Sequence, residues 1–268
     1  TSAPNVPTET ANPPMTDADL PEVPSTWSVT AGIVVIGDEI LSGRTKDTNV
    51  GHIAEYLTGI GIETREVRIV PDVTSMIVEA VDTLRARYTY VFTTGGIGPT
   101  HDDITADAIA TAFGVGIEID LRAVELIRQR KPDLELTAAR LRMARIPHGA
   151  ELIENPVSGA PGFQIGNVIV MAGVPRIMQG MLAGVGPRLR TGPRILSETV
   201  VAHLPEGRIA EPLSEIARAF ADVSIGSYPH FDGENYMTQV VVRSRDADRV
   251  AAAKAAVEEA VAKLEQTS

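Results

Sequence analysis

The segment from residue 90 to residue 105 constrains the fold of this 268-residue chain more than any other. It opens with residues 90–94, a short apolar, β-branched and aromatic run that is typical of a buried strand. Thr105 is a good helix N-cap, and Gly114 is placed to end that helix. Between strand and helix lies a turn with three glycines, Gly95, Gly96 and Gly98. The segment therefore predicts a strand, a tight turn and a helix, the repeating unit of an α/β protein.

The composition of this turn indicates the chemistry it serves. Glycines let backbone N–H groups approach an anion, and a helix N-terminus favours phosphate. The turn also holds Asp102 and Asp103 but no lysine or arginine. Carboxylates repel phosphate unless a divalent cation lies between them, so we expect Mg²⁺ or a similar ion, held by Asp102 and Asp103, to bridge to a phosphorylated ligand. The alternative is a tight turn whose aspartates only cap the helix.

Three further strand ends are expected at the same edge of the sheet. Strands are predicted at residues 31–36, 64–70 and 168–172, each followed by a loop and a helix. Asp72 follows the second of these, and Pro175 suits the first position of a helix after the third, where a second phosphate would fit. Because parallel strands present their carboxyl ends at one edge, these loops should surround a single pocket. The fold class is thus a three-layer α/β protein with a mostly parallel sheet and helices on both faces.

Few basic side chains are expected near this pocket. Arg44 and Lys46, between the first strand and its helix, are the bases that could grip phosphate oxygens, and solvated loop charges are the alternative. Amphipathic helices are predicted at residues 121–130 and 137–146. Their arginines stand beside acids, so we expect them on a solvated exterior.

Composition excludes several classes of function. The net charge of −11 argues against a nucleic-acid or anionic-membrane surface, because both depend on clustered lysine and arginine. The absence of cysteine excludes disulfides, thiolate zinc sites and a cysteine nucleophile. No apolar run approaches the roughly 20 residues that span a bilayer, and the start lacks a signal-peptide pattern. We therefore expect a cytoplasmic protein without nucleic-acid or membrane partners.

Composition also divides the chain into three parts. Residues 1–28 are rich in proline and small polar residues and are expected to form an extended or disordered arm. Residues 29–192 form the α/β domain. Residues 193–268 alternate predicted strands and helices and should form a small α+β module. This module has no G-x-x-G loop and no basic surface, so RNA binding is not expected.

The motifs resemble those of a known family. The run Thr93-Thr94-Gly95-Gly96-Ile97-Gly98-Pro99 with Asp103-Ile104-Thr105 is similar to the signature of the molybdopterin-binding domains that include MogA, MoaB, gephyrin and MoeA. Other segments resemble its CinA branch: residues 36–43, 47–49, 146–150, 155–157, 160–163 and 173–175. Residues 225–229 with 235–236 are similar to that branch and to the molybdopterin-binding-like portion of FAD synthases. Ser158-Gly159 and Arg176 depart from the usual pattern, which leaves ligand identity open.

This resemblance implies a fold and an activity. It implies a MogA/MoaB-like domain followed by a KH-like module, without the C-terminal amidohydrolase domain of full-length CinA proteins. The implied activity is divalent-metal-dependent hydrolysis of a nucleotide diphosphate such as ADP-ribose or FAD. The alternatives are molybdopterin binding or adenylylation, with molybdopterin as the ligand, and a non-catalytic nucleotide or pterin sensor. Family members commonly form dimers or trimers, so a homo-oligomer is expected.

The resemblance also implies roles for particular residues. Asp72 and Asp103 match functional aspartates of the MogA-like enzymes, and Asp72 would orient or deprotonate the attacking water. Asp102 is the additional acid of the CinA type. The residues implied in ligand binding are Gly37, Asp38, Glu39, Ser42, Gly43, Asp47, Asn49, Thr94, Gly95, Gly96, Gly98 and Pro175.

Overall fold

The computed structural model describes residues 29–133, 135–231, 233 and 236–266, so the predicted arm at residues 1–28 lies outside the described part. The chain divides into two compact units, Thr1–Gly192 and Pro193–Ser268. The first unit is built on a six-stranded sheet in the order β2-β1-β3-β8-β7-β6. Its strands are β1 (Val29–Ile36), β2 (Ile62–Val70), β3 (Tyr90–Thr94), β6 (Glu151–Ile153), β7 (Gly162–Ile165) and β8 (Val168–Met171). Strands β2, β1, β3 and β8 are parallel, whereas β7 pairs antiparallel with both of its neighbours, β8 and β6.

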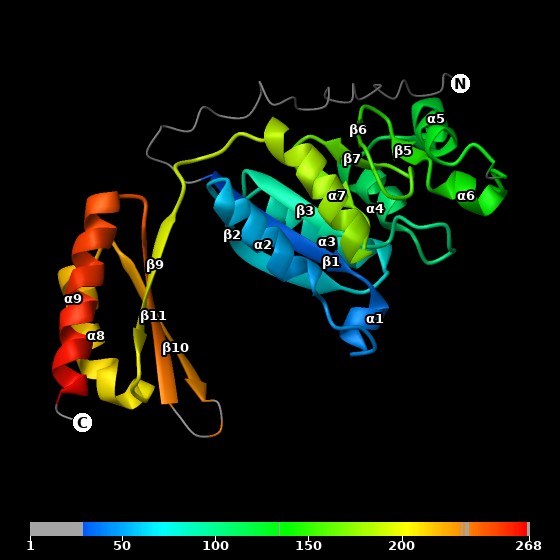
Figure 1. The fold of residues 1–268 in the computed structure, drawn as a ribbon. Helices are drawn as coiled ribbons and strands as arrows, with labels where there is room; N and C mark the ends of the chain where they lie inside the picture. Colours follow the sequence, from blue (N-terminus) through cyan, green and yellow to red (C-terminus); the bar gives the residue numbers. More distant parts are fainter. Residues whose placement is uncertain (1–28, 134, 232, 234–235, 267–268) are drawn as a thin grey trace, which may run out of the picture. The chain divides into compact units, whose positions relative to one another are not determined.

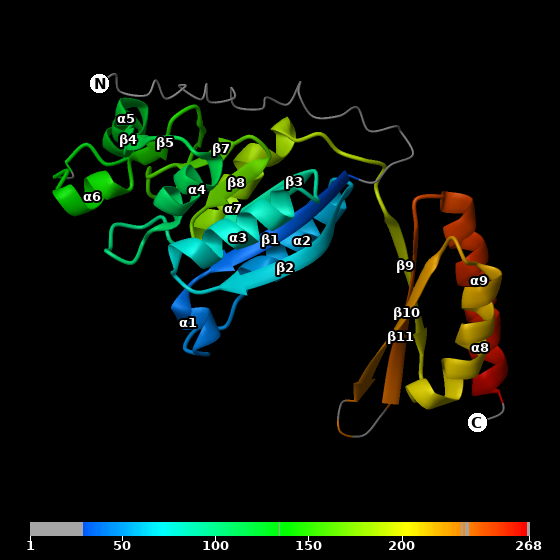
Figure 2. The same ribbon diagram turned by 180° about the vertical axis from the view of Figure 1, so that it is seen from behind.

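Helices cover both faces of this sheet (Figures 1 and 2). Alternate side chains of β1 enter opposite cores: Ile33 and Val35 pack with α2 (Asn49–Gly59) and α7 (Pro175–Val185). Val34 and Ile36 pack with α3 (Thr74–Arg85), α4 (Thr105–Phe113) and α5 (Leu121–Arg130). The predicted three-layer, mostly parallel architecture is therefore confirmed. Helix α4 ends at Gly114, which has the left-handed conformation (φ 65°) expected there.

Two loops contain elements that the sequence did not predict. The loop after β1 holds a four-residue helix, α1 (Asp38–Leu41). The predicted helix over residues 137–146 is shorter than expected: α6 covers Ala138–Arg142, and β5 (Arg145–Pro147) then pairs antiparallel with β4 (Ile117–Ile119). The physical reason is Pro147, which disfavours helical conformation in the residue before it and so makes Ile146 extended. A short 3-10 helix, η2 (Gly186–Arg188), follows α7.

The second unit is a small α+β module. Its strands β9 (Leu196–Ala202), β10 (Ser224–Phe231) and β11 (Tyr236–Ser244) form an antiparallel sheet in the order β10-β11-β9. Helices α8 (Glu206–Ala219) and α9 (Ala247–Glu265) pack on one face, around Val200, Val240 and Val257. The predicted α+β module is thus confirmed.

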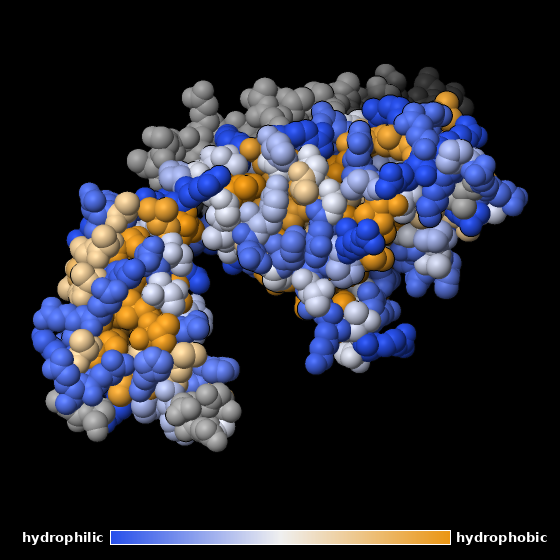
Figure 3. Space-filling view, in the orientation of Figure 1, coloured by the Kyte–Doolittle hydropathy of each residue, from blue (hydrophilic) through white to orange (hydrophobic). Residues whose placement is uncertain are grey.

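The surface matches the composition. In the space-filling view the visible faces of both units are largely hydrophilic, with hydrophobic residues showing in narrow strips (Figure 3). Among the described residues, no helix has the length and apolar character needed to cross a membrane.

Candidate functional site

The carboxyl ends of the four parallel strands meet at one edge of the first unit. Strand β1 lies between β2 and β3, so the order in which strands are added to the sheet reverses at β1. Open α/β sheets bind ligands in the crevice at such a point. Backbone hydrogen bonds join the loops that follow: Gly37 N donates to Val70 O at 3.1 Å, and Gly95 N donates to Met171 O at 3.2 Å. A Cβ added to Gly173 would lie 3.2 Å from the Gly95 Cα. The structure thus brings the four predicted loops together.

The glycines after β3 are required by packing. Gly95 has φ 109°, and a Cβ there would lie 2.1 Å from the Ile36 carbonyl oxygen. Gly96 has φ 68°, and its Cβ would lie 2.1 Å from the Thr105 hydroxyl. Thr105 is not the N-cap that the sequence suggested: it is the first residue of α4, and its hydroxyl donates to Gly95 O at 2.9 Å. The N-cap is Ile104, whose apolar side chain cannot cap, so this helix start lacks a side-chain cap.

Asp103 organises the loop between β3 and α4. Its Oδ1 accepts from Gly98 N at 2.7 Å, and its Oδ2 accepts from the N–H of Thr100 at 2.8 Å and from the Thr100 hydroxyl. A carboxylate accepts about four hydrogen bonds, so roughly one lone pair remains. Asp103 therefore holds the loop closed in this structure, and its predicted catalytic and metal-binding roles stay predictions.

The backbone N–H groups that are free to bind an anion are only in part those of the three turn glycines that the sequence indicated. Those of Gly95 and Gly98 donate to Met171 and Asp103, so they cannot also bind a phosphate. Among the described residues of the loop and first turn of α4 that line the neighbouring pocket, four N–H groups have no acceptor: two in the loop and two in the uncapped first turn. They belong to Gly96, Ile97, Ala106 and Asp107. The anion-binding role predicted for the loop thus falls to these four amides.

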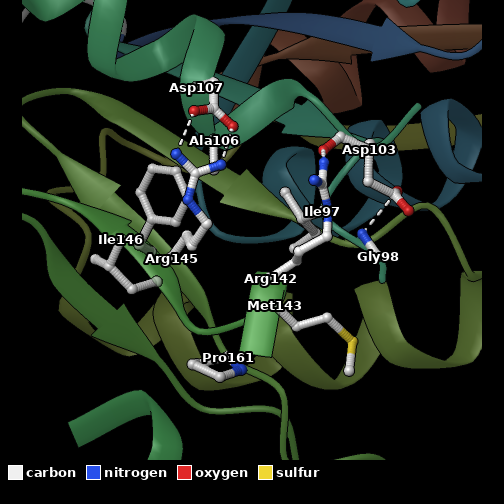
Figure 4. A pocket seen from close by; sticks show the side chains of 12 residues that line it. Ile97, Gly98, Asp103, Ala106, Asp107, Arg142, Met143, Arg145, Ile146 and Pro161 are labelled. Carbon is white, nitrogen blue, oxygen red and sulfur yellow. Dashed lines mark hydrogen bonds and ion pairs between the residues drawn. The ribbon is translucent and has the colours of Figure 1, made fainter. Parts of the chain in front are cut away.

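These amides border a narrow pocket (Figure 4). Its enclosed space is about 10 Å³, the room that one water molecule takes up, so a ligand would extend from it along the edge of the sheet. The residues that line it are Gly96, Ile97, Gly98, Asp103, Ala106, Asp107, Arg142, Met143, Arg145, Ile146, Pro161 and Phe163.

Two arginines of this pocket were wrongly placed by the sequence interpretation, which put them on a solvated exterior. Arg145 forms two hydrogen bonds with the carboxylate of Asp107, at 2.7 and 2.8 Å. Arg142 lies at the end of α6, and its Nη2 donates to Asp103 O at 3.4 Å. Its Nε is buried and finds no acceptor in the described part of the chain. The sequence signal that could have corrected this placement is the Ile146-Pro147 pair. Because a residue before proline disfavours helical conformation, the pair predicts that the helix ends before Ile146.

A cluster of carboxylates lies beside the loop. Asp72 follows β2, and its Oδ2 accepts from Asp38 N at 3.0 Å. Partial burial raises the pKa of Asp72 above its ordinary value, and the negative charges of Asp38, Glu39 and Asp102 raise it further, against the lowering effect of that hydrogen bond. Asp102 therefore lies close enough for its charge to affect the pKa of Asp72. In the described residues, no lysine or arginine forms an ion pair with Asp38, Glu39 or Asp72.

This cluster does not form a closed metal cage. Within the described residues, no three histidine, aspartate or glutamate side chains converge closely enough to hold a metal ion by themselves. A cation bound here would have to complete its shell with water and ligand oxygens, which is how Mg²⁺ is usually held. The neighbouring predicted residues Ser42 and Gly43, and the bases Arg44 and Lys46, lie exposed in the loop after α1.

Other predicted residues form a hydrogen-bond network at the same edge. The buried Asn49 donates through Nδ2 to the Thr94 hydroxyl at 2.8 Å and to Gly173 O at 2.7 Å. The Thr94 hydroxyl donates to Ala172 O at 3.0 Å. Asp47 Oδ1 accepts from Val50 N at 2.9 Å in the first turn of α2. This network ties the start of α2 to the ends of β3 and β8, and ligand binding by these residues stays a prediction.

Two predicted features lie at the start of α7. Pro175 occupies the first helical position, as its fixed φ favours, and it is exposed together with Arg176. The helix has no side-chain cap. A second phosphate at this position stays a prediction.

Asn49→Ala should lower the stability of the first unit by about 1–3 kcal/mol, because it removes the hydrogen bonds that a buried side chain donates to the buried Thr94 hydroxyl and to the Gly173 carbonyl. Urea unfolding followed by circular dichroism measures this change. Thr48→Ala is the matched control, since Thr48 is exposed and makes no side-chain cap bond. Equal stabilities of the two variants would contradict a structural role for the network.

The fold and this edge define the class of protein. Residues 32–191 match the family model described as a probable molybdopterin binding domain, and the chain belongs to that family. Its CinA-like character is supported by a solved structure. The CinA protein of Thermoplasma acidophilum, described as having unknown function, is 34% identical, with a TM-score of 0.57 over 60% of this chain and 98% of that chain. Residues 194–266 match a second model, the middle domain of FAD synthase.

Two relatives cover about three quarters of the chain. A protein of Aeropyrum pernix is 35% identical over 221 residues, which cover 78% of this chain and 81% of that protein. A protein of Archaeoglobus fulgidus is 34% identical over 197 residues, which cover 74% of this chain and 84% of that protein.

Proposed function

We propose that this protein is a divalent-metal-dependent pyrophosphatase that hydrolyses a nucleotide diphosphate such as ADP-ribose or FAD. The observation that carries the proposal is the meeting, at one edge of the sheet, of carboxylates that have no lysine or arginine partner in the described residues and backbone N–H groups that have no acceptor there. The carboxylates favour a cation and the N–H groups favour an anion. A diphosphate bound with a divalent cation supplies both.

The donor chemistry of the carboxylates fits a hard cation such as Mg²⁺. Asp38, Glu39, Asp72 and Asp102 offer oxygen ligands, and in the part of the chain that the structure describes their one ion-pair neighbour is His101, beside Asp102. The pKa of Asp72 is raised first by partial burial and then by the charges of Asp38, Glu39 and Asp102, and a bound cation would relieve that repulsion. Asp102 is exposed, and its pKa is lowered chiefly by a hydrogen bond from Thr100, whereas Asp103 has most of its lone pairs occupied within the loop. When bound, the ion would neutralise phosphate charge and acidify a coordinated water.

Residues of the protein would then bind the phosphate and accept the proton of the attacking water. The N–H groups of Gly96 and Ile97 and of the first turn of α4 would bind the phosphate oxygens. Asp72 is positioned at the edge by the amide of Asp38, at 3.0 Å. Its raised pKa makes it a stronger base than an ordinary aspartate, so it would accept the proton of the attacking water.

A second candidate is favoured by the family model itself. That model describes residues 32–191 as a probable molybdopterin binding domain, so molybdopterin binding or its adenylylation would use the same edge. Hydrolysis and adenylyl transfer differ in the acceptor, water or a pterin phosphate. The same loop and the same two aspartates, Asp72 and Asp103, would serve either reaction.

The test is to incubate the pure protein with Mg²⁺ and either ADP-ribose or FAD and to follow AMP by chromatography. FAD is included because the second unit matches a model named for FAD synthase. We expect AMP release that depends on the cation and is abolished by a chelator. Binding of either compound without AMP would refute the hydrolase and favour a sensor, whereas a copurifying pterin, identified by mass spectrometry, would favour the molybdopterin alternative.

Homo-oligomer formation and a cytoplasmic location are part of the same proposal. Size-exclusion chromatography with light scattering measures the first, and fractionation of cells that produce the protein measures the second.

A further inference from the structure

The two arginines of the pocket differ in what they contact (Figure 4). Arg145 gives two N–H groups to the two carboxylate oxygens of Asp107, so its charge is neutralised. Arg142 forms no ion pair: its Nη2 donates to the Asp103 carbonyl at 3.4 Å, and its buried Nε meets no acceptor in the described residues. From this contrast we propose that Arg142 is a specificity-determining residue that selects diphosphate ligands by binding one of their two phosphate groups. This inference rests on the proposed function.

The chemistry of the guanidinium supports this role. It is always charged and carries five N–H donors in a plane that matches the oxygens of a phosphate. In Arg142 one of these donors makes a long contact and the buried Nε makes none. Arg142 therefore keeps its charge and most of its donors for a ligand, whereas Arg145 does not.

The location of Arg142 determines which ligands it distinguishes. It borders the same pocket as Gly96, Ile97 and Gly98. The carboxylates Asp72 and Asp102 repel any phosphate that is not accompanied by a cation. A diphosphate can place one phosphate against Arg142 and share the other with a cation beside the carboxylates. A monophosphate can contact either Arg142 or the cation beside the carboxylates but not both, so its binding should be weaker.

The experiment measures binding without turnover. The protein and three variants, Arg142→Gln, Arg142→Lys and Arg140→Gln, are titrated in Mg²⁺ with imidodiphosphate, a non-hydrolysable diphosphate, and with inorganic phosphate, by calorimetry. Arg140 is the matched control, because it is a half-buried arginine of the same helix that does not line the pocket, and its Nη1 bonds to the Glu135 carbonyl. Circular dichroism verifies that each variant is folded.

We expect imidodiphosphate to bind more tightly than phosphate. Arg142→Gln should weaken imidodiphosphate binding about 10- to 100-fold, the effect of losing charge-assisted hydrogen bonds. Arg142→Lys should lie in between, because lysine keeps the charge but loses the planar fork. Arg140→Gln should bind as the unchanged protein does.

Three outcomes would overturn the inference: no binding of imidodiphosphate, equal affinities for imidodiphosphate and phosphate, or unchanged affinity in Arg142→Gln. A variant that loses turnover of ADP-ribose while retaining imidodiphosphate affinity would also overturn it, because Arg142 would then act by positioning the Asp103 carbonyl. If imidodiphosphate binding depends on Arg142 and no nucleotide is hydrolysed, the inference stands and the proposed hydrolase activity fails.

Discussion

Asp72→Asn is expected to lower cation-dependent release of AMP by about 10²- to 10⁴-fold, the usual contribution of a general base. Asparagine has nearly the same shape as aspartate, and its side-chain oxygen can still accept the hydrogen bond from Asp38 N. The substitution therefore removes the charge and the basicity without removing the contact. Steady-state kinetics with ADP-ribose or FAD, at saturating Mg²⁺, measures the change.

The same variant should be at least as stable as the unchanged protein at neutral pH. The folded-state pKa of Asp72 lies above its ordinary value of 3.8, so the ionised carboxylate destabilises the folded state. Below pH 3.8 both forms are uncharged and the difference vanishes. The stability advantage of the variant should grow as the pH rises through the raised pKa and then stay constant. Urea unfolding between about pH 4 and about pH 7 measures this advantage.

A control separates the site from general charge effects. Asp133→Asn removes one negative charge from an exposed aspartate in the loop after α5. It should leave turnover unchanged. If Asp72→Asn retains full turnover, Asp72 is not the base, and if it is less stable at neutral pH, the carboxylate contributes a contact that the amide cannot replace.

The sequence predicted the architecture well where local patterns determine it. Residues 90–94 form the buried strand β3, and Gly114 ends α4 in the left-handed conformation, because apolar periodicity and glycine geometry act over a few residues. The loops after β1, β2, β3 and β8 could be placed at one edge for the same reason. Parallel strands fix the direction of every loop that follows them.

The details of the site depended on long-range contacts that a sequence pattern does not show. Thr105 looked like a cap, yet its hydroxyl bonds to Gly95, ten residues earlier in the chain. Asp103 looked free to hold a metal ion, yet its carboxylate accepts hydrogen bonds from Gly98 and Thr100. Arg142 lies 39 residues from Asp103 in the sequence, and its contact arises because the chain leaves the helix before Pro147. The residue types were predictable, but their partners were not.

Gly95→Ala should lower the stability of the first unit by about 2–6 kcal/mol, a large part of the 5–15 kcal/mol that folded domains possess. Two costs add. At φ 109° an alanine is strained by about 1–3 kcal/mol, and a Cβ at 2.1 Å from Ile36 O forces two strand ends apart, which costs a similar amount. The neighbour is backbone, so no flexible side chain can move aside. Urea unfolding measures the loss, and failure to fold would agree with it.

Gly51→Ala is the matched control for this prediction. Gly51 lies inside α2, is exposed, and has no atom within 4 Å of an added Cβ. Alanine there should stabilise the protein by up to about 1 kcal/mol, because it is the better helix former. The same substitution should thus have opposite signs at the two positions. A mild effect at Gly95 would mean that the end of β3 can move away from β1, and the edge on which the proposed site depends would then be loose.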